Sequence, residues 1–591
     1  MFEMKKRVHE INLGISGGKR IILLSKVLYR SVVLNGGGTL YYPPEYDNKF
    51  ESLKNKTENY KDVTEFVTYI KKNILNGIFV LKNGEEFIAG CSYLDSSLKW
   101  YETGDRIILS DSAVEIAKKE NLELFSDSVA SYLITGLPVY PFETVSFWRE
   151  IIQISPFDIL KITLGKASAE MFYTQVELNR NIEPVIEGIR KKLIDNLCDI
   201  KKSYNSFSCD VSGGVDSACI VYMMNKITDN LMLFHSESNE NANSDTKWAG
   251  YIARDLKIKL NKLQSVGKSG KRFSVEDDFL YGNVPDAPLL WGDTEGYVSE
   301  MLKSLPEYNK HIHMIGIGGD ELYTAMPANE WSIIRQEGIK SIPFALKYSI
   351  LMRRPFFSCM KDLYSKTDYQ DELHEAVDFA FGKRKSGSKR EQRWSDNPDV
   401  PKWITSEYMN KCYEMIKKEI DTRCMKICND KMQFQSVQSV IFQKNVFSQI
   451  NQIASDKIAW YAPFLDAQVI EDSLSIPARY RTEASTTKPT LYKALKGIVP
   501  EEVFKRGVKG DYSDALYEGY REAASKYCKE IKDFELARMG IINAEMLSTE
   551  LSMPSAVHNR VDEFMRVCNA ERWIRQVKNY IERVEVNYVI I

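Results

Sequence analysis

The first 180 residues show short apolar runs separated by turn residues, a pattern typical of antiparallel strands. The segment "GIFVLKNGEEFIAGCSYL", residues 77–94, places two such runs on either side of Asn83-Gly84, a dipeptide typical of hairpin turns. Similar pairs surround Gly104 in residues 99–111 and Gly165 in residues 157–173. Residues 127–136 between them are predicted to form a helix that ends at Gly136. We therefore expect a layered α+β domain over residues 1–180.

The pattern changes near residue 180, where helix-period segments begin to alternate with short apolar strands. Strands are predicted at Ser206–Val211, Asn230–His235 and His311–Ile315, with helices between them. This alternation is typical of a parallel α/β sheet. The stripe "FQSVQSVIFQKNVFSQI", residues 434–450, has apolar residues at helical spacing and is interpreted as core. The second domain, residues 181–591, is thus predicted to combine a parallel sheet with a mainly helical C-terminal part.

Residues 382–402, "GKRKSGSKREQRWSDNPDVPK", are polar, basic and interrupted by Gly and Pro. One interpretation is a mobile surface loop. The other is a flexible segment that touches an anionic or peptide substrate.

Composition narrows the choice of function only slightly. The chain has 591 residues, so at least two domains are expected, and its net charge is -2. This balance gives no reason to expect nucleic acid or an acidic membrane as a partner. No apolar run reaches the roughly 18–20 residues of a membrane span. The ten cysteines are scattered without a CxxC pair, and the N-terminus lacks a long apolar stretch, so we expect a cytoplasmic protein with reduced thiols.

The string "FSCDVSGGVDSACIVYMM", residues 207–224, predicts a strand, a glycine-rich turn and a helix in succession. Such a turn forms an anion site, because the free N–H groups and the helix dipole point outward and Gly permits close approach. In a parallel sheet the turn lies at the carboxyl end of a strand, where these folds bind ligands. The turn residues are Ser212, Gly213, Gly214, Val215, Asp216 and Ser217. The hydroxyls can donate to an anion, and Asp216 is a hard oxygen ligand suited to Mg²⁺.

A second turn of the same kind occurs about a hundred residues later. In "HMIGIGGDELY" an apolar strand precedes Gly316, Gly318 and Gly319, and the acidic pair Asp320-Glu321 follows. If the two strands are neighbours, Asp216 and Asp320 can share Mg²⁺.

SGGVDS matches the pyrophosphate-binding loop of N-type ATP pyrophosphatases, which cleave ATP to AMP and pyrophosphate. No Walker-type GKS or GKT accompanies it. Together with GIGGDEL (316–322) and "WYAPFLD" (460–466), it makes the chain resemble the asparagine synthetase family. The N-terminal strands resemble the glutamine-hydrolysing domain of that family. The resemblance implies a degenerate glutamine-amidotransferase-like β-sandwich followed by an ATP-pyrophosphatase domain, with ATP and Mg²⁺ as cofactors.

Two departures from the family pattern bear on function. Glutamine-using members expose a cysteine as their first residue after Met removal, and its thiol is the nucleophile. Here residue 2 is Phe and the first cysteine is Cys91, inside a predicted strand, so the domain is expected not to release ammonia. Asparagine synthetases carry Glu, and β-lactam synthetases Tyr, at the position of Ile317, which cannot move a proton.

The amine must then come from elsewhere, and an amine on the same molecule is already placed for attack. Residues 488–521 and "GGDELYTAMPAN", residues 318–329, resemble lasso peptide cyclases. Those enzymes adenylate an Asp or Glu side chain of a peptide, whose N-terminal amine then closes a macrolactam. The resemblance implies a precursor peptide as substrate and a leader peptidase or recognition element as partner. Alternatives are a small-molecule amide synthetase of the β-lactam type and an inactive scaffold, although the intact aspartates argue against the latter.

The resemblance also assigns residues outside the two turns. Lys509 matches the lysine that amide-forming relatives direct at the acyl-adenylate, where a fixed cation stabilises developing charge. Lys488, restrained by the Pro that follows it, and Arg506 are candidates to contact pyrophosphate. The backbones of Val211, Phe234 and His235, at predicted strand ends, are expected to bind adenosine, and His235 is either a base or a packed histidine.

The segment "NVPDAPLLWGDTEGY", residues 283–297, carries three acids, Asp286, Asp293 and Glu295. A second metal site and a peptide-binding loop are both open interpretations of this segment.

Overall fold

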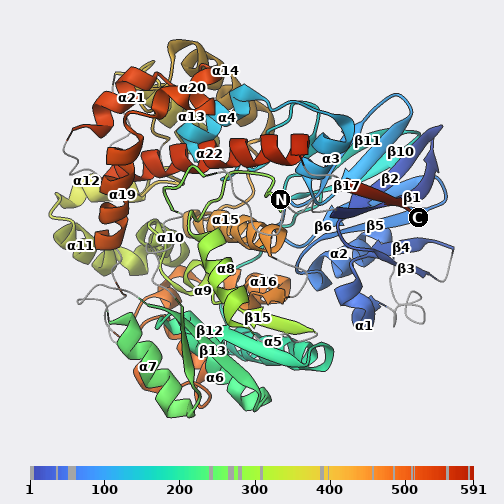
Figure 1. The fold of residues 1–591 in the computed structure, drawn as a ribbon. Helices are drawn as coiled ribbons and strands as arrows, with labels where there is room; N and C mark the ends of the chain where they lie inside the picture. Colours follow the sequence, from blue (N-terminus) through green and yellow to red (C-terminus); the bar gives the residue numbers. More distant parts are fainter. Residues whose placement is uncertain are drawn as a thin grey trace.

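A computed structural model describes the chain as two packed sheets, a separate parallel sheet and a large helical region (Figure 1). In the view of Figure 1 the two packed sheets lie at the right, the parallel sheet lies at the bottom, and most C-terminal helices lie at the top and left. The structure describes residues 6–591 except 35–36, 51–61, 137, 238–243, 264–271, 277–282, 306–309, 386–391, 397, 455–457, 484–485, 507–509, 511–512, 554–557 and 584–585.

The first sheet of the N-terminal region has the strand order β17-β1-β2-β8-β7-β9. Five of its strands come from the first 160 residues: β1 (Lys6–Ser16), β2 (Lys19–Ser25), β7 (Lys99–Glu102), β8 (Arg106–Ser110) and β9 (Ile152–Gln153). The sixth, β17 (Val586–Ile590), comes from the other end of the chain and runs parallel to β1. This strand was not predicted from the sequence.

The second sheet has the order β11-β10-β6-β5-β4-β3 and is antiparallel throughout. Its strands are β3 (Arg30–Val33), β4 (Thr39–Tyr42), β5 (Ile78–Asn83), β6 (Glu86–Cys91), β10 (Asp158–Thr163) and β11 (Lys166–Met171). Gly84 and Gly165 both have positive φ, +61° and +72°, in the tight turns that join β5 to β6 and β10 to β11. The hairpins predicted at these two glycines are therefore confirmed, as is the hairpin of β7 and β8 around Gly104.

The two sheets pack face to face as a sandwich. Leu23 and Leu109 of the first sheet share a buried cluster with Val80 and Leu160 of the second. The outer face of the second sheet is covered by α1 (Asp47–Phe50) and α2 (Val63–Asn73), which follow the short 3-10 helix η1 (Pro44–Tyr46). The outer face of the first sheet is covered by α3 (Ala113–Glu120), and α4 (Ser126–Thr135) follows it in the chain. As predicted, α4 stops at Gly136, which is left-handed at φ +71°.

The third sheet is entirely parallel, in the order β14-β13-β12-β15-β16. Its strands are β12 (Ser206–Asp210), β13 (Leu231–Ser236), β14 (Leu260–Leu263), β15 (His311–Met314) and β16 (Ile458–Tyr461). Helices α5 (Glu183–Ser203), α6 (Val215–Ile227), α7 (Asp245–Leu256) and α8 (Thr294–Ser304) alternate with them along the chain. The predicted parallel α/β sheet is confirmed, whereas the four-residue strands β14 and β16 were not predicted.

The rest of the chain is mainly helical, as expected. Its shorter members are α9 (Gly319–Tyr323), α10 (Asn329–Glu337), η5 (Gly338–Ser341), α11 (Ile342–Leu351), α12 (Phe356–Leu363), α13 (Tyr369–Ala380), η6 (Pro463–Leu465), α16 (Ala467–Leu474), η7 (Ala478–Arg481), α17 (Pro489–Leu495), α18 (Glu501–Phe504), η8 (Ile531–Asp533), α20 (Glu535–Arg538) and α21 (Ala544–Leu551). Its longer members are α14 (Ser406–Arg423), α15 (Lys431–Ile453), α19 (Ser513–Tyr527) and α22 (His558–Arg583). No helix in the described ranges is long and apolar enough to cross a membrane.

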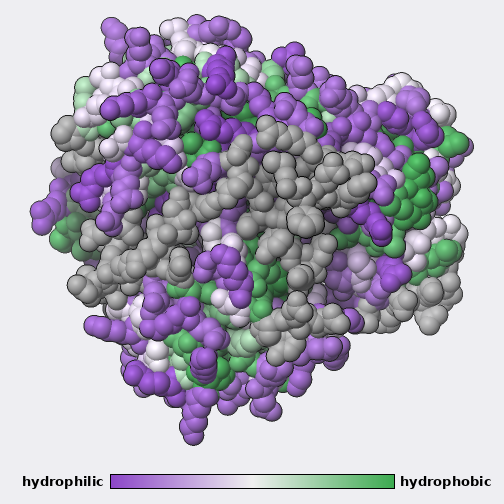
Figure 2. All heavy atoms as spheres, in the orientation of Figure 1, coloured by the Kyte–Doolittle hydropathy of each residue, from purple (hydrophilic) through white to green (hydrophobic). Residues whose placement is uncertain are grey.

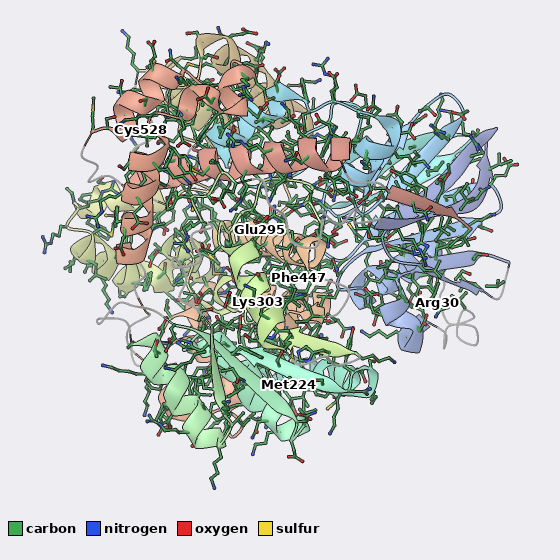
Figure 3. All side chains as sticks on the ribbon, in the orientation of Figure 1. Arg30, Met224, Glu295, Lys303, Phe447 and Cys528 are labelled. Carbon is green, nitrogen blue, oxygen red and sulfur yellow. The ribbon has the colours of Figure 1, made fainter. Side chains whose placement is uncertain are left out.

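Two long helices tie the regions together. Helix α15 is buried over most of its length and carries Phe447 in the middle of the molecule (Figure 3), so the predicted core stripe is confirmed. Helix α22 crosses the molecule towards the sandwich and leads into β17 (Figure 1). One buried cluster contains Leu133 of α4, Val221 of α6, Phe447 of α15 and Trp573 of α22. The boundary placed at residue 180 stays a prediction, because the core is continuous across it.

The basic segment 382–402 lies partly outside the described residues. In its described part, Gln392 and Trp394 are buried, at 3% and 5% exposure. The Trp394 backbone N–H donates to Glu372, and buried Lys431 donates to the Gln392 carbonyl at 2.7 Å. Gln392 and Trp394 are therefore anchored in the core, whereas residues 382–385 are exposed.

Candidate active site

The first glycine-rich turn connects β12 to α6 at the carboxyl end of the central strand. Gly213 has φ +89°, and a Cβ atom there would come 2.4 Å from the Asp245 carbonyl oxygen, so both conformation and space require glycine. The Ser212 and Ser217 hydroxyls lie 2.9 Å apart, and the Ser212 N–H donates to Ser217 Oγ at 3.1 Å. The loop is thus held in a fixed shape by its own side chains.

The second turn connects β15 to α9 on the neighbouring parallel strand. A Cβ atom on Gly319 would lie 2.2 Å from Asp216 Oδ1, and one on Gly316 would lie 2.9 Å from the Ser217 nitrogen. These glycines are needed because the two turns pack directly against each other. The predicted adjacency of the turns is therefore present in the structure.

Lys488 lies between the two aspartates that were expected to share a metal ion. Its Nζ is 2.7 Å from Asp320 Oδ1 and 2.5 Å from Asp216 Oδ1. Burial alone would lower the pKa of Lys488, but Asp216 and Asp320 outweigh it, and the pKa is raised. Lys488 has φ +54° and lies immediately before Pro489, at the start of α17.

This trio fits a magnesium-bound polyphosphate. Two carboxylates and one ammonium leave one net negative charge beside a turn lined with N–H groups. Mg²⁺ in nucleotide sites is held by one or two carboxylates, with substrate phosphates and water completing its shell. In the described part of the chain, no group of three or more His, Cys, Asp or Glu side chains is placed to hold a metal alone. Asp216 and Asp320 would hold the ion, which would neutralise phosphate charge.

A cavity of about 890 Å³ opens above the two turns. Among the predicted residues, those in its wall are Ser212, Gly214, Val215, Asp216, Ser217, Gly316, Asp320, Lys488 and Arg506. Gly213 supports the turn from behind through its close packing on Asp245. Lys509 lies outside the described residues, so its predicted role remains a prediction. Ile317 of the second turn also lines the cavity. Two apolar residues from other segments line it as well: Trp291, which is 41% exposed, and Leu516 of α19.

Three predicted adenosine contacts fall behind the cavity wall. The Val211 N–H donates to the Phe234 carbonyl at 2.7 Å, and the Val211 carbonyl bonds His235 Nδ1 at 2.7 Å. Val211, Phe234 and His235 are each 1% exposed or less, and the cavity instead meets Ser236 at the end of β13. Strand β13 runs to Ser236, and the adenosine contact at Val211, Phe234 and His235 stays a prediction.

His235 is a packed histidine. Its Nε2 bonds Thr246 Oγ1 at 2.9 Å, so both ring nitrogens have partners inside the protein. Burial lowers the pKa of His235, against the opposing effect of the Val211 carbonyl. The ring is neutral near pH 7 and has no path to the cavity.

A chain of hydrogen bonds that the sequence analysis missed ends at the cavity wall. His311 Nε2 and His313 Nδ1 each lie 2.7 Å from Ser208 Oγ, and His313 Nε2 lies 3.2 Å from Asp210 Oδ1. The Tyr297 hydroxyl donates to the same Asp210 oxygen at 2.7 Å. Burial lowers the pKa of His311 to about 4, so that ring is neutral. Asp210 lines the cavity and is held in place by His313 and Tyr297.

One sequence pattern could have indicated these hydrogen bonds. It is the alternation His311-x-His313 on β15 beside Ser206-x-Ser208 on β12. Parallel pairing places Ser206 opposite His311 and Ser208 opposite His313. Period-2 alternation puts all four side chains on one face of the sheet. Without knowing that the two strands are neighbours, the pattern has no meaning.

Asp245, at the start of α7, is a second residue that the sequence analysis missed. Its carboxylate pairs with Arg506 and accepts the Gly510 N–H at 3.0 Å. Its backbone packs on Gly213. Asp245 therefore connects the first glycine-rich turn to Arg506 and Gly510, which lie on either side of residues 507–509.

The three acids of residues 283–297 do not form a second metal site. Asp286 pairs with Lys99 at 2.9 Å in the contact with the sandwich, and Asp293 pairs with Arg272 at 2.6 Å. Glu295 accepts from Gln576 of α22 at 2.8 Å and points into the middle of the molecule (Figure 3). Trp291, Gly292 and Asp293 do line the cavity, which agrees with the alternative of a substrate-binding loop.

The sandwich offers no comparable centre at its cysteine. Cys91 is fully buried, donates to the Asp95 carbonyl at 2.8 Å, and has its pKa raised by burial to about 12. A thiol in this state is neither accessible nor nucleophilic at neutral pH.

The comparisons with known proteins agree with the site just described. The family model for asparagine synthase matches residues 200–575, which is more than half of the chain and includes both glycine-rich turns and Lys488. No curated protein matches the chain. Members of this family use ATP, usually with Mg²⁺, to form amide bonds. The chain therefore belongs to the asparagine synthase family and is an ATP-dependent ligase that forms amide bonds.

Proposed function

We propose that this ligase is a lasso peptide cyclase. It converts an Asp or Glu side-chain carboxylate of a ribosomal precursor peptide into an acyl-adenylate, and the N-terminal amine of the same peptide displaces AMP. One amide bond forms, and the peptide loses one water. The proposed partners are the precursor peptide and a leader peptidase or recognition element, and the proposed location is the cytoplasm.

The observation that carries the proposal is the contrast between an assembled phosphate site and a buried Cys91. The two turns, Asp216, Asp320 and Lys488 are together, so activation of a carboxylate is supported. Cys91 is the first cysteine of the chain and is inaccessible, so glutamine is not supported as the nitrogen source. An amine carried by the substrate itself removes the need for a second site.

The cavity supports a substrate larger than an amino acid. Its volume of about 890 Å³ is near the upper end of the roughly 300–1,000 Å³ of small-molecule sites. Apolar side chains contribute much of the cavity wall: Leu290, Trp291, Ile317, Ile450, Leu516 and Met565. Such a wall suits peptide side chains better than free ammonia or a single polar amino acid.

Each residue has a defined task in this proposal. The first glycine-rich turn, residues 212–217, binds phosphate oxygens, and Asp216 and Asp320 would hold Mg²⁺. Lys488 balances their charge and faces the departing pyrophosphate. Lys509 is assigned to the charge that develops while the amide forms. Asp210, backed by His313 and Tyr297, offers a carboxylate oxygen in the cavity wall to a protonated amine.

The test uses the purified chain with ATP, Mg²⁺ and the precursor peptide encoded beside its gene, together with the leader-processing partner. The expected product is lighter than the processed peptide by one water, and AMP appears in equal amount. Formation of ADP, or no dehydrated peptide in the presence of all components, contradicts the proposal. Amide formation only with a small β-amino acid would instead support a β-lactam-type synthetase.

A further inference from the structure

The helix pair α11 and α12, with the residues on either side, has an unusual composition. The stretch between Glu337 and Asp362, which ends inside α12, reads "GIKSIPFALKYSILMRRPFFSCMK" and contains no Asp or Glu. Its five cations are Lys340, Lys347, Arg353, Arg354 and Lys361. The whole chain has a net charge of -2, so this positive charge is local and is hidden by the average.

One side of the helix pair accounts for its folding. Ala345 and Tyr348 of α11 and Cys359 and Leu363 of α12 are buried against Trp331 and Ile334 of α10. This small cluster is separate from the main core. A surface helix normally exposes polar residues on its other side.

Here the other side is apolar as well. Ile342, Leu346 and Ile350 are 46%, 50% and 69% exposed and follow one another at four-residue spacing along α11. Leu351 is 69% exposed, and Phe357, near the start of α12, is 85% exposed. Figure 2 shows hydrophobic atoms at the left margin of the molecule, where Figure 1 places α11. Surface apolar residues are ordinary singly, but a contiguous group marks an interaction site.

The cations border these apolar side chains and remain available. Lys340, Lys347, Arg353 and Lys361 are exposed, whereas Arg354 pairs with Asp362. The acids on the elements packed nearby have other partners. Glu337 pairs with Arg479, and Glu330 accepts from Gln392. We name the exposed group of Ile342, Leu346, Ile350, Leu351, Phe357, Lys340, Lys347, Arg353 and Lys361 the basic apolar patch.

We propose that the basic apolar patch docks the enzyme on an anionic lipid surface. The combination of aliphatic and aromatic side chains with Lys and Arg is what peripheral membrane helices use: the apolar groups enter the acyl boundary and the cations meet phosphate headgroups. The net charge and the lack of a membrane span had led us to expect no membrane partner. Neither observation bears on a local patch of this kind, and the proposal does not depend on the identity of the ligase substrate.

The same features disfavour a second copy of this chain as the occupant. Two copies meeting at this face would bring two sets of cations together without an acid from either patch. The side chains with the greatest exposure, Ile350, Leu351 and Phe357, flank the turn between α11 and α12 and project outward from it. Projecting apolar groups can enter a fluid lipid boundary without a preformed groove in a partner.

The test is co-sedimentation of the full-length protein with vesicles of pure phosphatidylcholine and with vesicles containing 30% phosphatidylglycerol. Wild type is expected to bind the anionic vesicles and to be released by 0.5 M NaCl, because salt screens the headgroup attraction. The Phe357→Glu/Ile350→Glu variant and the Lys347→Glu/Lys361→Glu variant should each lose binding by about tenfold or more.

Leu164→Glu is the matched control, because Leu164 is 80% exposed and lies outside the patch, in the turn between β10 and β11. It makes the same chemical change outside the patch and should bind as wild type does. Thermal melting and ATP turnover show that each variant is folded. If one patch variant does not fold, the other still tests the patch.

Three results would overturn the proposal. They are equal binding to neutral and anionic vesicles, unchanged binding of both folded patch variants, and no binding of wild type to anionic vesicles. A patch that fails with vesicles but binds an acidic peptide stoichiometrically belongs to a protein partner, and the lipid proposal is then wrong.

Discussion

The N-terminal sandwich and the parallel sheet use their charged side chains differently. In the sandwich and its contacts, charged groups are used in pairs that hold the structure: Lys99 with Asp286, and buried Lys444 on the Ser92 hydroxyl at 3.0 Å. At the carboxyl edge of the parallel sheet, Asp216, Asp320 and Lys488 converge on one cavity. The difference arises from the turns, since Gly213, Gly316 and Gly319 let two loops approach where larger residues would clash.

The largest effect is expected from removing either aspartate. Asp216→Ala or Asp320→Ala takes a hard ligand from Mg²⁺ and leaves Lys488 partly uncompensated, so AMP formation should fall by about 10³-fold or more. The rate of pyrophosphate release measures this. Asp105→Ala, which removes an exposed surface pair with Arg20, is the matched control and should have no effect. Near wild-type turnover in either variant would remove that aspartate from the site.

Lys509→Met should have the next largest effect. The residue is assigned to charge that develops during amide formation, and loss of one such donor costs about 10²–10³ in rate. Peptide affinity should stay unchanged while product yield falls, which fluorescence anisotropy and mass spectrometry measure separately. A normal yield of dehydrated peptide would exclude Lys509 from the mechanism.

Asp245→Asn tests whether the cavity depends on its support. The asparagine keeps the size but loses the charge that pairs with Arg506, so kcat should fall by about 10–100-fold with little change in melting temperature. Asp245→Glu should recover part of the rate. A large loss of stability in the asparagine variant, with no specific change in kcat, would mean that the residue is only structural.

Glu143 allows a smaller test in the sandwich. Burial raises the pKa of Glu143 to about 7, so the folded state holds its proton more tightly than the unfolded state does. Below about pH 4.5 the buried Glu143 carboxyl does not lower the free energy of unfolding. The free energy of unfolding falls as pH rises to about 7, and above that pH it is lower by about 3 kcal/mol. Glu143→Gln should therefore melt a few degrees higher than wild type at pH 8 and nearly equally at pH 4.5. ATP turnover should be unchanged, and a difference in melting temperature independent of pH contradicts the assignment.

The smallest effect is expected at Cys91. Cys91→Ala should leave AMP formation unchanged, and neither form should release glutamate from glutamine above a no-enzyme control. The reason is the buried, hydrogen-bonded thiol, whose pKa of about 12 keeps it protonated. Glutamate release by wild type that disappears in the Cys91→Ala variant would mean that the sandwich also contains a catalytic centre.

Local features of the fold could be predicted from the sequence. The hairpin turns at Gly84 and Gly165, the helix that ends at Gly136, the three central strands and both glycine-rich turns could be predicted because a few neighbouring residues determine each. Relations between distant segments could not. Lys488 was recognised as a candidate, but its place between two aspartates requires a backbone turn at φ +54° that no local pattern indicates. Asp245 has no motif at all, and its importance appears only where its backbone meets Gly213.

The parallel pairing of β17 with β1 affects how the protein is made. Lys6 of the first described strand lies opposite Val586, so the edge of that sheet stays open until residues 586–590 have left the ribosome. Until then β1 presents unpaired backbone groups, which are a template for association with other chains. The hydrogen bonds between β1 and β17 therefore form after the rest of the sandwich has been synthesised. Expression of residues 1–180 alone would leave this edge permanently open, whereas adding residues 586–590 as a separate peptide could close it.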